Sequence, residues 1–597
     1  MENKVNLNDY PWLKNYKDIP YNLNYPKCSM IELVESTAKK YPKNIAYEYY
    51  GKETTYKQFI SKIEQIAKSL KSLGVKQNDR VTICMPNTPE GILSVYAVNM
   101  IGAVANMVHP LSSENEIEYY LKLSHSKYLI CIDLICEKIM KIVSNTSVKK
   151  VIVASVSEEM NTLVSTLYWI TQGHKVKNNK NAEDVMFWKD FIQLGSNYTG
   201  LYHNPNKYKE PAVILYSGGT TGKPKGIVLT NLNFNALAMQ AHLMCDPSNE
   251  GDSILSIMPI FHGFGLGVCV HTPLVIGMKC ILIPSFRADK FYELIKKYKP
   301  NFLVGVPTLF EALLKNKKIG KHDLKCVKCI VSGGDTMPSA LKKRVDKFLL
   351  HHGSNAQVRE GYGLTEGTAA SCLTPSNCYK ESTIGIPFPD MMYKIVKYGT
   401  VDKCNYDEIG EICISGPTVM MGYLDDIKET LNTLKYHHSD NKIWLHTGDL
   451  GSMDENGFVY FKQRAKRLII SSGYNIYPSY IEKVLNAHPD INSSCVVGIK
   501  HPYKQQVAKA IIVLNEGVKP TDAVKKSIED HCKLNLAKYS LPYVYEFRNS
   551  IPKTLVGKVA YTKLENGEEK YDEWKNKSYC RRQCMHPKNK RKVCWMW

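Results

Sequence analysis

The chain has 597 residues, more than a single hydrophobic core usually supports, so at least two domains are expected. Its 44% hydrophobic and 23% charged residues are typical of a folded globular protein and exclude a mostly disordered chain. The formal net charge of +21 suits anionic ligands, but no RNP, zinc-finger or basic-helix pattern accompanies it, so nucleic acid is not an expected partner.

The first residues contain no hydrophobic signal region, so we expect a cytoplasmic protein, with peripheral contact to a membrane left open. The uncharged stretch 91–108 is long enough to span a membrane. Gly102 interrupts it, however, which favours a buried helix followed by a strand. The 18 cysteines are scattered, mostly through apolar runs, and are expected to be reduced core thiols.

Helical and strand patterns alternate through the first 145 residues. Helices are predicted over 30–40, 55–73 and 90–101, and strands over 80–86 and 128–133. Such alternation is typical of an α/β fold with parallel sheets covered by helices on both faces. Between 157 and 208 the pattern loosens, which favours a surface insertion packed on the core over a segment on a membrane surface.

A strand-type run over 212–216 leads into the segment SGGTTGKPKG at 217–226. Its glycines free the backbone and its hydroxyls and lysines supply donors, so the loop can wrap phosphate. It is not a Walker A loop, because the glycine spacing is one residue short and Pro224 replaces the magnesium-binding hydroxyl. A flexible turn is the alternative interpretation.

Further βα units follow, and three of their strand ends carry candidate site residues. His262 comes after a strand predicted over 253–259, between glycine and aromatic residues, where it is placed for a cleft. SGGD at 332–335 gives the backbone room for an adenine ring, although a tight turn would look the same. REGYGLTE at 359–366 combines an aromatic face, a hydroxyl and a carboxylate.

Asp449, within WLHTGDLG, is expected to lie in a turn, where its carboxylate would accept bonds from a ribose diol or only cap the turn. The charged stretch 463–467 marks the expected domain boundary. After it, 466–568 reads as a compact α+β unit that ends in PKTLVGK, with Lys558 last. The basic tail 569–597 is expected to be disordered.

These motifs, in this order, resemble the AMP-forming acyl-adenylate superfamily, which includes acyl-CoA synthetases and adenylation domains of peptide synthetases. The resemblance covers roughly 33–564. It implies an α/β protein with a large N-terminal adenylate-forming domain over 1–465, built from parallel α/β sheets with a small β-barrel-like subdomain. It also implies a smaller mobile α+β C-terminal domain over 466–568.

The resemblance implies a binding role for a set of residues along the chain. Those matching the nucleotide and pantetheine site are Ser217, Gly218, Gly219, Thr220, Thr221, Gly222, Lys223, Lys225, Gly333, Gly334, Asp335, Gly361, Tyr362, Gly363, Asp449, Arg464, Lys466 and Gly473. Tyr362 would stack on adenine and Asp449 and Arg464 would contact the ribose. Lys466 would be the hinge, and the loop at Gly473 would face the pantetheine arm.

Four residues match the catalytic positions of the superfamily. Lys558 would be the cation of the transition state and His262 would lie beside the acyl carboxylate. Thr365 would bond the α-phosphate, and Glu366 would bind Mg²⁺, which favours one or two carboxylates together with phosphate oxygens. The departures are Gln463, in place of a usual Gly or Asp, and Tyr480, in place of a usual Glu; both bear on the hinge region rather than on the chemistry.

The implied reaction uses ATP, Mg²⁺ and CoA to convert a carboxylic acid into acyl-AMP and then a thioester. The acyl-CoA synthetase branch is favoured, because no carrier domain follows and no Asp reader for an amino group precedes His262. The acyl-pocket segments 262–266, 306–310 and 368–372 are small and apolar, which favours a medium- or long-chain fatty acid. An aryl-CoA ligase, an acyl-carrier-protein ligase and a non-catalytic adenylate-binding protein remain alternatives, and the oligomeric state is left open.

Overall fold

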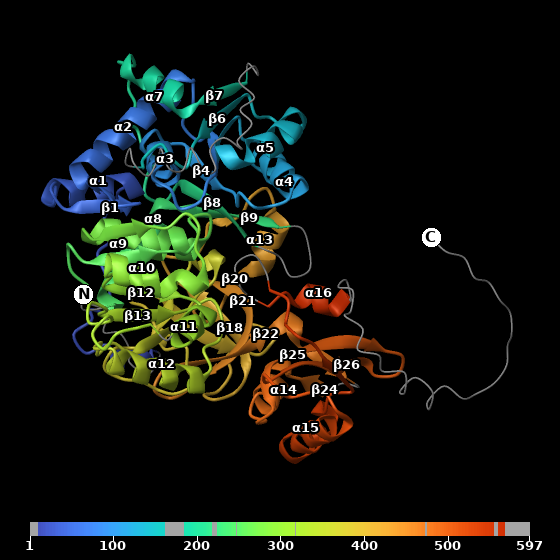
Figure 1. Cartoon of the computed structure of the whole chain (residues 1–597). Coiled ribbons are helices and arrows are strands. Elements are labelled where there is room, and N and C mark those ends of the chain that lie inside the picture. Colours follow the sequence, from blue (N-terminus) through green and yellow to red (C-terminus); the bar gives the residue numbers. More distant parts are fainter. Residues whose placement is uncertain are drawn as a thin grey trace, which may run out of the picture.

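The computed structural model describes residues 10–160, 184–217, 224–245, 248–316, 318–471, 474–553 and 559–566. Across these ranges the chain builds two large mixed sheets, a smaller antiparallel sheet and a C-terminal sheet (Figure 1). This is the expected α/β architecture. Residues 161–183 of the loosened stretch and the whole basic tail lie outside the described residues, whereas the later part of the loosened stretch contains a short strand and a helix, over Val185–Phe187 and Trp188–Ser196. No helix in the described ranges combines the length and apolarity needed to cross a bilayer.

The first large sheet has eight strands and is parallel from β8 to β7. In spatial order they are β19 (Gly422–Tyr423), β9 (Lys225–Thr230), β8 (Pro211–Ser217), β4 (Val104–Met107), β3 (Arg80–Cys84), β5 (Tyr128–Ile132), β6 (Lys150–Ala154) and β7 (Val185–Phe187). The helices around it are α2 (Tyr56–Ser72), α3 (Pro89–Met100), α4 (Glu114–Ser124), α5 (Cys136–Ile142) and α7 (Trp188–Ser196).

The second large sheet has nine strands and is parallel from β14 to β1. In spatial order they are β16 (Ile386–Pro387), β15 (Cys372–Leu373), β14 (Val358–Tyr362), β13 (Cys329–Ser332), β12 (Phe302–Gly305), β10 (Ser253–Ser256), β11 (Lys279–Leu282), β1 (Ile45–Tyr49) and β2 (Lys52–Thr55). Its helices are α1 (Met30–Lys40), α8 (Asn231–Met244), α9 (Thr272–Ile276), α10 (Phe291–Tyr298), α11 (Pro307–Leu314) and α12 (Ser339–His351), together with the π-helix η5 (Phe264–His271).

Local sequence explains where the helices begin. Thr55 and Gln58 form a capping box at the start of α2, which satisfies backbone N–H groups that have no partner within the helix. Thr88 caps α3, and Pro89 occupies its first turn, where its missing N–H costs nothing. Every residue of α3 is buried, so this helix, which holds the first part of the uncharged stretch, belongs to the core, as the interruption at Gly102 indicated.

Two smaller sheets complete the fold. The antiparallel sheet orders β17 (Met392–Val396), β18 (Gly410–Ser415), β21 (Lys442–Met453) and β20 (Leu434–His437), with β22 (Val459–Arg464) also on β21 and α13 (Ile427–Thr433) beside it. The C-terminal sheet orders β24 (Tyr474–Ile476), β23 (Ile469–Ser471), β26 (Gln505–Leu514) and β25 (Ile491–His501), with β27 (Val544–Phe547) on β26. Helices α14 (Pro478–Leu485), α15 (Asp522–Asn535) and α16 (Tyr561–Asn566) accompany it.

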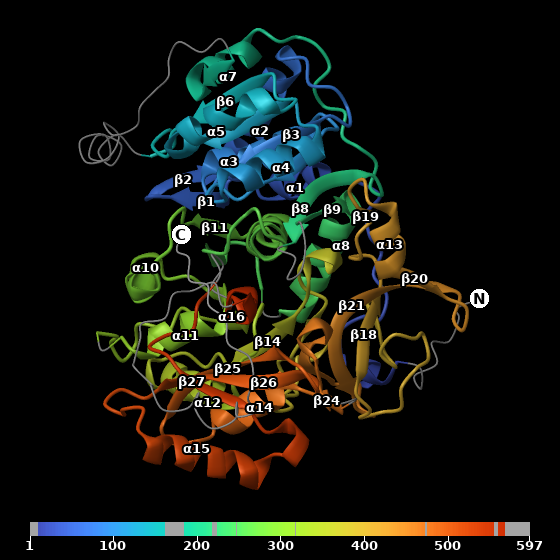
Figure 2. The ribbon, with the colours of Figure 1, turned by 90° about the vertical axis from the view of Figure 1, so that its right-hand side faces the viewer.

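The C-terminal sheet has its own hydrophobic core, in which Ile481, Val496 and Ile528 are buried. Its first strand begins a few residues after β22 ends, next to the charged stretch of the sequence. Figure 2 shows α15 and α16 on opposite sides of this sheet, with α16 on the side toward the N-terminal sheets. The domain boundary at Lys466 stays a prediction.

Candidate active site

A single cavity of about 2590 Å³ is lined by residues from all three N-terminal sheets and from the C-terminal sheet. Every predicted site residue within the described ranges lines it: Ser217, Lys225, His262, Gly333, Gly334, Asp335, Gly361, Tyr362, Gly363, Thr365, Glu366, Asp449, Arg464 and Lys466. The others, Gly218, Gly219, Thr220, Thr221, Gly222, Lys223, Gly473 and Lys558, lie outside the described residues. The roles of both groups remain predictions.

The carboxyl ends of parallel strands explain much of this clustering. Ser217 ends β8, the Gly333 loop follows β13, and Tyr362 ends β14. His262 lies between β10 and the π-helix η5. Ligands of open α/β sheets bind at such strand ends, where loops leave the sheet edge and converge.

The Gly/Thr-rich segment connects two antiparallel strands, because β8 pairs with β9 from Ser217 to Lys225. Lys225 forms an ion pair with Glu429 of α13, and its ammonium lies 4.9 Å from the centre of the Tyr423 ring. Tyr423 also donates a hydrogen bond to Glu366 Oε1 at 3.1 Å. The sequence analysis did not predict Tyr423 of β19 or Glu429 of α13, because neither residue lies in a motif that points to the site.

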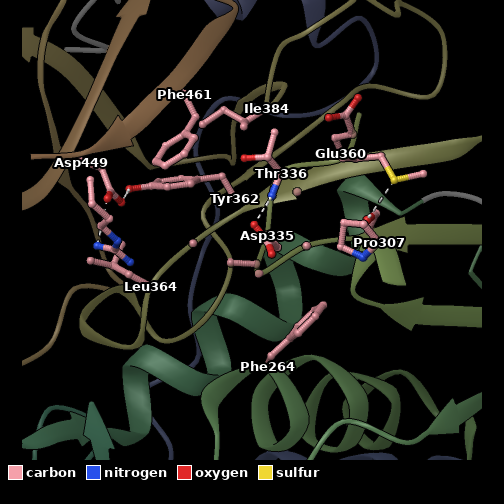
Figure 3. Close-up of a pocket in the computed structure, with 18 of the residues that line it drawn as sticks. Phe264, Pro307, Asp335, Thr336, Glu360, Tyr362, Leu364, Ile384, Asp449 and Phe461 are labelled. Carbon is pink, nitrogen blue, oxygen red and sulfur yellow. Dashed lines mark hydrogen bonds and ion pairs between the residues drawn. The ribbon is translucent and has the colours of Figure 1, made fainter. Parts of the chain in front are cut away.

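The loop after β13 and Tyr362, both predicted to bind the base, line one part of the cavity (Figure 3). A Cβ at Gly333 would lie 3.3 Å from Gly361 O and 3.4 Å from the Phe264 ring, so a side chain there would occupy the cavity. Asp335 is exposed and accepts the Thr336 N–H at 2.8 Å. The Tyr362 ring lies 6.2 Å from the Phe461 ring, at a tilt of 35°.

Asp449 lies in the long strand β21, so the expectation that it sits in a turn was wrong. Its Oδ2 accepts the Tyr362 hydroxyl at 2.6 Å, and its Oδ1 lies 2.9 Å from Arg464 Nη1. Asp449 is 1% exposed and the Arg464 side chain 47% exposed, so the guanidinium covers the carboxylate on the solvent side. A ribose diol that binds Asp449 must therefore either displace the Arg464 guanidinium or bond to both side chains.

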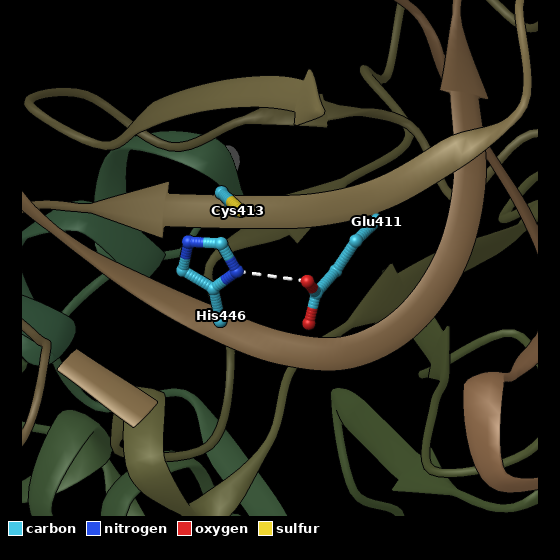
Figure 4. A group of neighbouring side chains, drawn as sticks. All are labelled: Glu411, Cys413 and His446. Carbon is cyan, nitrogen blue, oxygen red and sulfur yellow. Dashed lines mark hydrogen bonds and ion pairs between the residues drawn. The ribbon is translucent and has the colours of Figure 1, made fainter. Parts of the chain in front are cut away.

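Glu411 of β18 and His446 of β21, the strand that carries Asp449, point toward each other (Figure 4). His446 Nδ1 is 2.8 Å from Glu411 Oε2, and the Gly448 N–H donates to Glu411 Oε1 at 3.0 Å. Ligand atoms of these two residues and of Cys413 lie within 4.8 Å of one another. Glu411 and His446 already bond each other, and burial raises the pKa of the Cys413 thiol well above its usual value, so the group fits a hydrogen-bonded brace better than a metal site.

His262 lies where polar and apolar parts of the cavity meet. Its Nδ1 accepts the Phe264 N–H at 3.2 Å, which leaves Nε2 as the protonated nitrogen of the neutral ring. The same cavity is lined by apolar side chains of α8, β10 and β12, namely Ala241, Ile254, Phe302 and Val304. Two predicted acyl-pocket segments contribute Pro307 and Ala369. The arrangement can hold an acid by a polar head and an apolar chain.

The C-terminal unit closes part of the cavity. Lys553 and Val559 pair as an antiparallel bridge, and both line the cavity, as does Tyr561. Lys558 directly precedes Val559 in the sequence. The described residues on either side of the predicted catalytic lysine therefore face the same space as Glu366 and Asp449.

The sequence matches two family models in succession. Residues 34–424 match the model described as AMP-binding enzyme, and residues 480–558 match the AMP-binding enzyme C-terminal domain. The first match alone spans more than half of the chain. Neither family model extends into the basic tail.

Similar proteins share nearly the whole length. A long-chain-fatty-acid–CoA ligase of Bacillus subtilis is 33% identical over 93% of this chain and 97% of that protein. A long-chain-fatty-acid–CoA ligase of Escherichia coli O157:H7 is 28% identical over 94% of this chain and 98% of that protein. Among solved structures, the anthranilate CoA ligase AuaEII in complex with anthranoyl-AMP has a TM-score of 0.78 at 23% identity, covering 92% of this chain and 98% of that one.

Proposed function

The chain belongs to the AMP-binding enzyme family, and from this premise we propose that it activates a fatty acid with ATP and joins it to coenzyme A. The carboxylate attacks the α-phosphorus of ATP, pyrophosphate leaves, and acyl-AMP forms. The CoA thiolate then attacks the acyl carbon and AMP leaves with the bonding electrons. The products are acyl-CoA, AMP and pyrophosphate.

The observation that carries this proposal is the gathering of the described candidate residues around one cavity. They come from segments as far apart as Ser217 and Lys466, yet all line the same space. Apolar side chains of α8, β10 and β12 line the same space. An enzyme that brings two substrates into one site gains most from such fixed placement.

Each group has a proposed task. Asp449 and Arg464 receive the ribose, Tyr362 and the Gly333 loop hold the base, and Thr365 donates to the α-phosphate. The segment from Ser217 to Lys225 holds the leaving phosphates. Lys225 now pairs with Glu429, so bound phosphate would compete with that carboxylate for its ammonium.

Two anions must meet in this reaction, so cations and aligned donors contribute most to the rate. Lys558 supplies an ammonium between the carboxylate and the α-phosphate. Glu366, partly exposed with Tyr423 on one oxygen, offers the hard oxygen ligand that suits Mg²⁺, and the ion when bound would offset phosphate charge. His262 orients the acyl carboxylate.

We propose a medium- or long-chain fatty acid as the acid. The apolar lining of α8, β10 and β12 supports an alkyl chain, and the bacterial relatives with 33% and 28% identity are named long-chain-fatty-acid–CoA ligases. An aryl acid is the second candidate, because the protein with anthranoyl-AMP shares the fold at a TM-score of 0.78. The alternative of a non-catalytic adenylate-binding protein predicts no turnover at all.

The test is carboxylate-dependent exchange of labelled pyrophosphate into ATP with saturated acids of increasing length and with aryl acids. Acyl-CoA formation is then measured with CoA or with acyl-carrier protein as the acceptor. We expect exchange with fatty acids and a thioester with CoA. A preference for aryl acids would show that the substrate is an aryl acid and not a fatty acid. Transfer to carrier protein alone would show that the acceptor is not CoA. If no acid led to AMP, the proposed function would be overturned.

A further inference from the structure

The strand that carries Asp449 is distorted at that residue. Strands β18 and β21 are in register at Cys413 with His446 and again at Glu411 with Leu450. Between these pairs, one residue of β18 faces three residues of β21, namely Thr447, Gly448 and Asp449. The extra residues form a bulge, and bulges near active sites re-aim a side chain.

The bulge interrupts the ladder, so its backbone groups need other partners. Gly448 has φ +68, a left-handed conformation that glycine adopts without strain, and its N–H donates to Glu411 Oε1 at 3.0 Å. Thr447 Oγ1 donates to Ile412 O at 2.6 Å and accepts the Asp449 N–H at 3.1 Å. The bulge is therefore held by side chains of its own and of the neighbouring strand.

Glu411 is itself held in place. His446 Nδ1 lies 2.8 Å from its Oε2, and His446 Nε2 lies 2.9 Å from His437 Nε2. Burial would raise the pKa of Glu411, but hydrogen bonds from His446 and Gly448 keep it below its usual value. Burial and the nearby Lys394 ammonium lower the pKa of His437 to about 4, so that ring is neutral near pH 7.

We propose that Glu411, oriented by His446, is a positioning residue that sets the bulge and thereby aims Asp449 at the ribose of ATP. This inference rests on the proposed function, in which Asp449 receives the ribose hydroxyls. Glu411 lines the same cavity, but in this proposal it does not bind the ribose itself. It acts through the Gly448 N–H, the bond that fixes the backbone one residue before Asp449.

The test compares ATP with 2′,3′-dideoxy-ATP in fatty-acid-dependent formation of acyl-adenylate by the full-length protein. In Glu411→Gln the side chain keeps one acceptor oxygen in place of two. It therefore loses either the bond to His446 or the bond from the Gly448 N–H. We expect KM for ATP to rise roughly tenfold, the size of a lost hydrogen bond to a charged group, with kcat nearly unchanged. The ratio of kcat/KM between ATP and the dideoxy analogue should fall by a similar factor, because the analogue lacks the hydroxyls that Asp449 binds.

A second pair of variants separates positioning from folding. His446→Asn keeps a donor near the place of Nδ1, so it should retain the wild-type ratio of kcat/KM between ATP and the dideoxy analogue. His446→Leu removes the donor, so it should lower this ratio as Glu411→Gln does. Asp440→Asn is the matched control. Asp440 is an exposed carboxylate in the turn between β20 and β21, bonded to Lys394 and Trp444, and among the described residues no hydrogen bond joins it to the bulge. Its variant should keep the ratio.

Thermal unfolding of each variant accompanies the kinetics. The inference is overturned if wild type, Glu411→Gln and His446→Leu have the same ratio of kcat/KM between ATP and the dideoxy analogue. It is also overturned if the ratio falls in proportion to lost stability in every variant, Asp440→Asn included. Wild-type protein that forms no acyl-adenylate from ATP would instead overturn the proposed function, so the two failures are distinct.

Discussion

At the scale of single residues, polar groups in this fold differ in how their burial is compensated. Asp449 is nearly inaccessible, yet Tyr362 and Arg464 meet its two oxygens. Glu90, in the first turn of α3, is fully buried, and neither of its carboxylate oxygens makes a well-formed hydrogen bond with the described residues. Burial raises its pKa to about 8, so it is held as the neutral acid.

Glu90→Gln should change how stability depends on pH. The folded wild type keeps the proton up to about pH 8, whereas the unfolded chain releases it near 4.5, so wild-type stability falls as pH rises through this window. The variant cannot ionise there. Its free energy of unfolding relative to wild type should therefore increase by up to about 1.4 kcal/mol per pH unit. Urea denaturation at several pH values measures this, and a constant difference would contradict it.

At the scale of elements, the turn after β14 depends on close backbone packing. Thr368 and Ala369 have φ of 60° and 109°, in the left-handed region that non-glycine residues rarely adopt. A Cβ at Gly363 would lie 1.5 Å from Ala369 O, so this glycine lets the two arms of the turn touch. The turn between them carries Thr365 and Glu366.

Gly363→Ala should destabilise the protein by about 3 kcal/mol or more, because one arm of the turn must move away. Gly361→Ala, two residues earlier in β14, is the matched control. Its Cβ would lie 3.4 Å from the Leu373 side chain, 3.5 Å from Val331 and 3.6 Å from Cys372 O, all ordinary van der Waals contacts, so the change should stay below about 1 kcal/mol. Chemical denaturation of both variants measures the difference. Similar stabilities would show that the turn relaxes without cost.

At the scale of the whole molecule, the cavity exists only because four sheets converge on it. The N-terminal sheets supply the residues proposed to bind the nucleotide and the acid, and the C-terminal unit supplies Lys553, Val559 and Tyr561. We propose that this unit rotates about Lys466 between the two half-reactions, first presenting Lys558 and then the Gly473 loop. That motion would let one site serve two different attacking groups.

Lys558→Ala should separate the half-reactions. Formation of acyl-AMP should fall by a factor of about a hundred or more, because the charge that offsets two meeting anions is lost. Thioester formation from supplied acyl-AMP should remain largely intact. Lys563→Ala, at an exposed lysine of α16, is the control and should leave both steps near wild type. Equal loss of both half-reactions in Lys558→Ala would refute the assignment.

The elements were predictable where the local pattern is strong. The helix expected over 30–40 is α1, and the strand expected over 80–86 is β3, ending at Cys84. Family membership and the α/β fold expected from the motifs are confirmed. Fixed spacing of glycines, hydroxyls and carboxylates is a local property, so the sequence already named the candidate residues that line the cavity.

Partners across strands and sheets were decided only by the tertiary structure. Asp449 was expected in a turn, but it occupies a bulge in β21 that Glu411 holds from β18. Tyr423, which bonds Glu366 from 57 positions further along the chain, had no local signal. The sequence by itself determined which chemistry is present. Only the tertiary structure decided which side chains contact and orient one another. Strand register and packing form between segments that are far apart in the sequence.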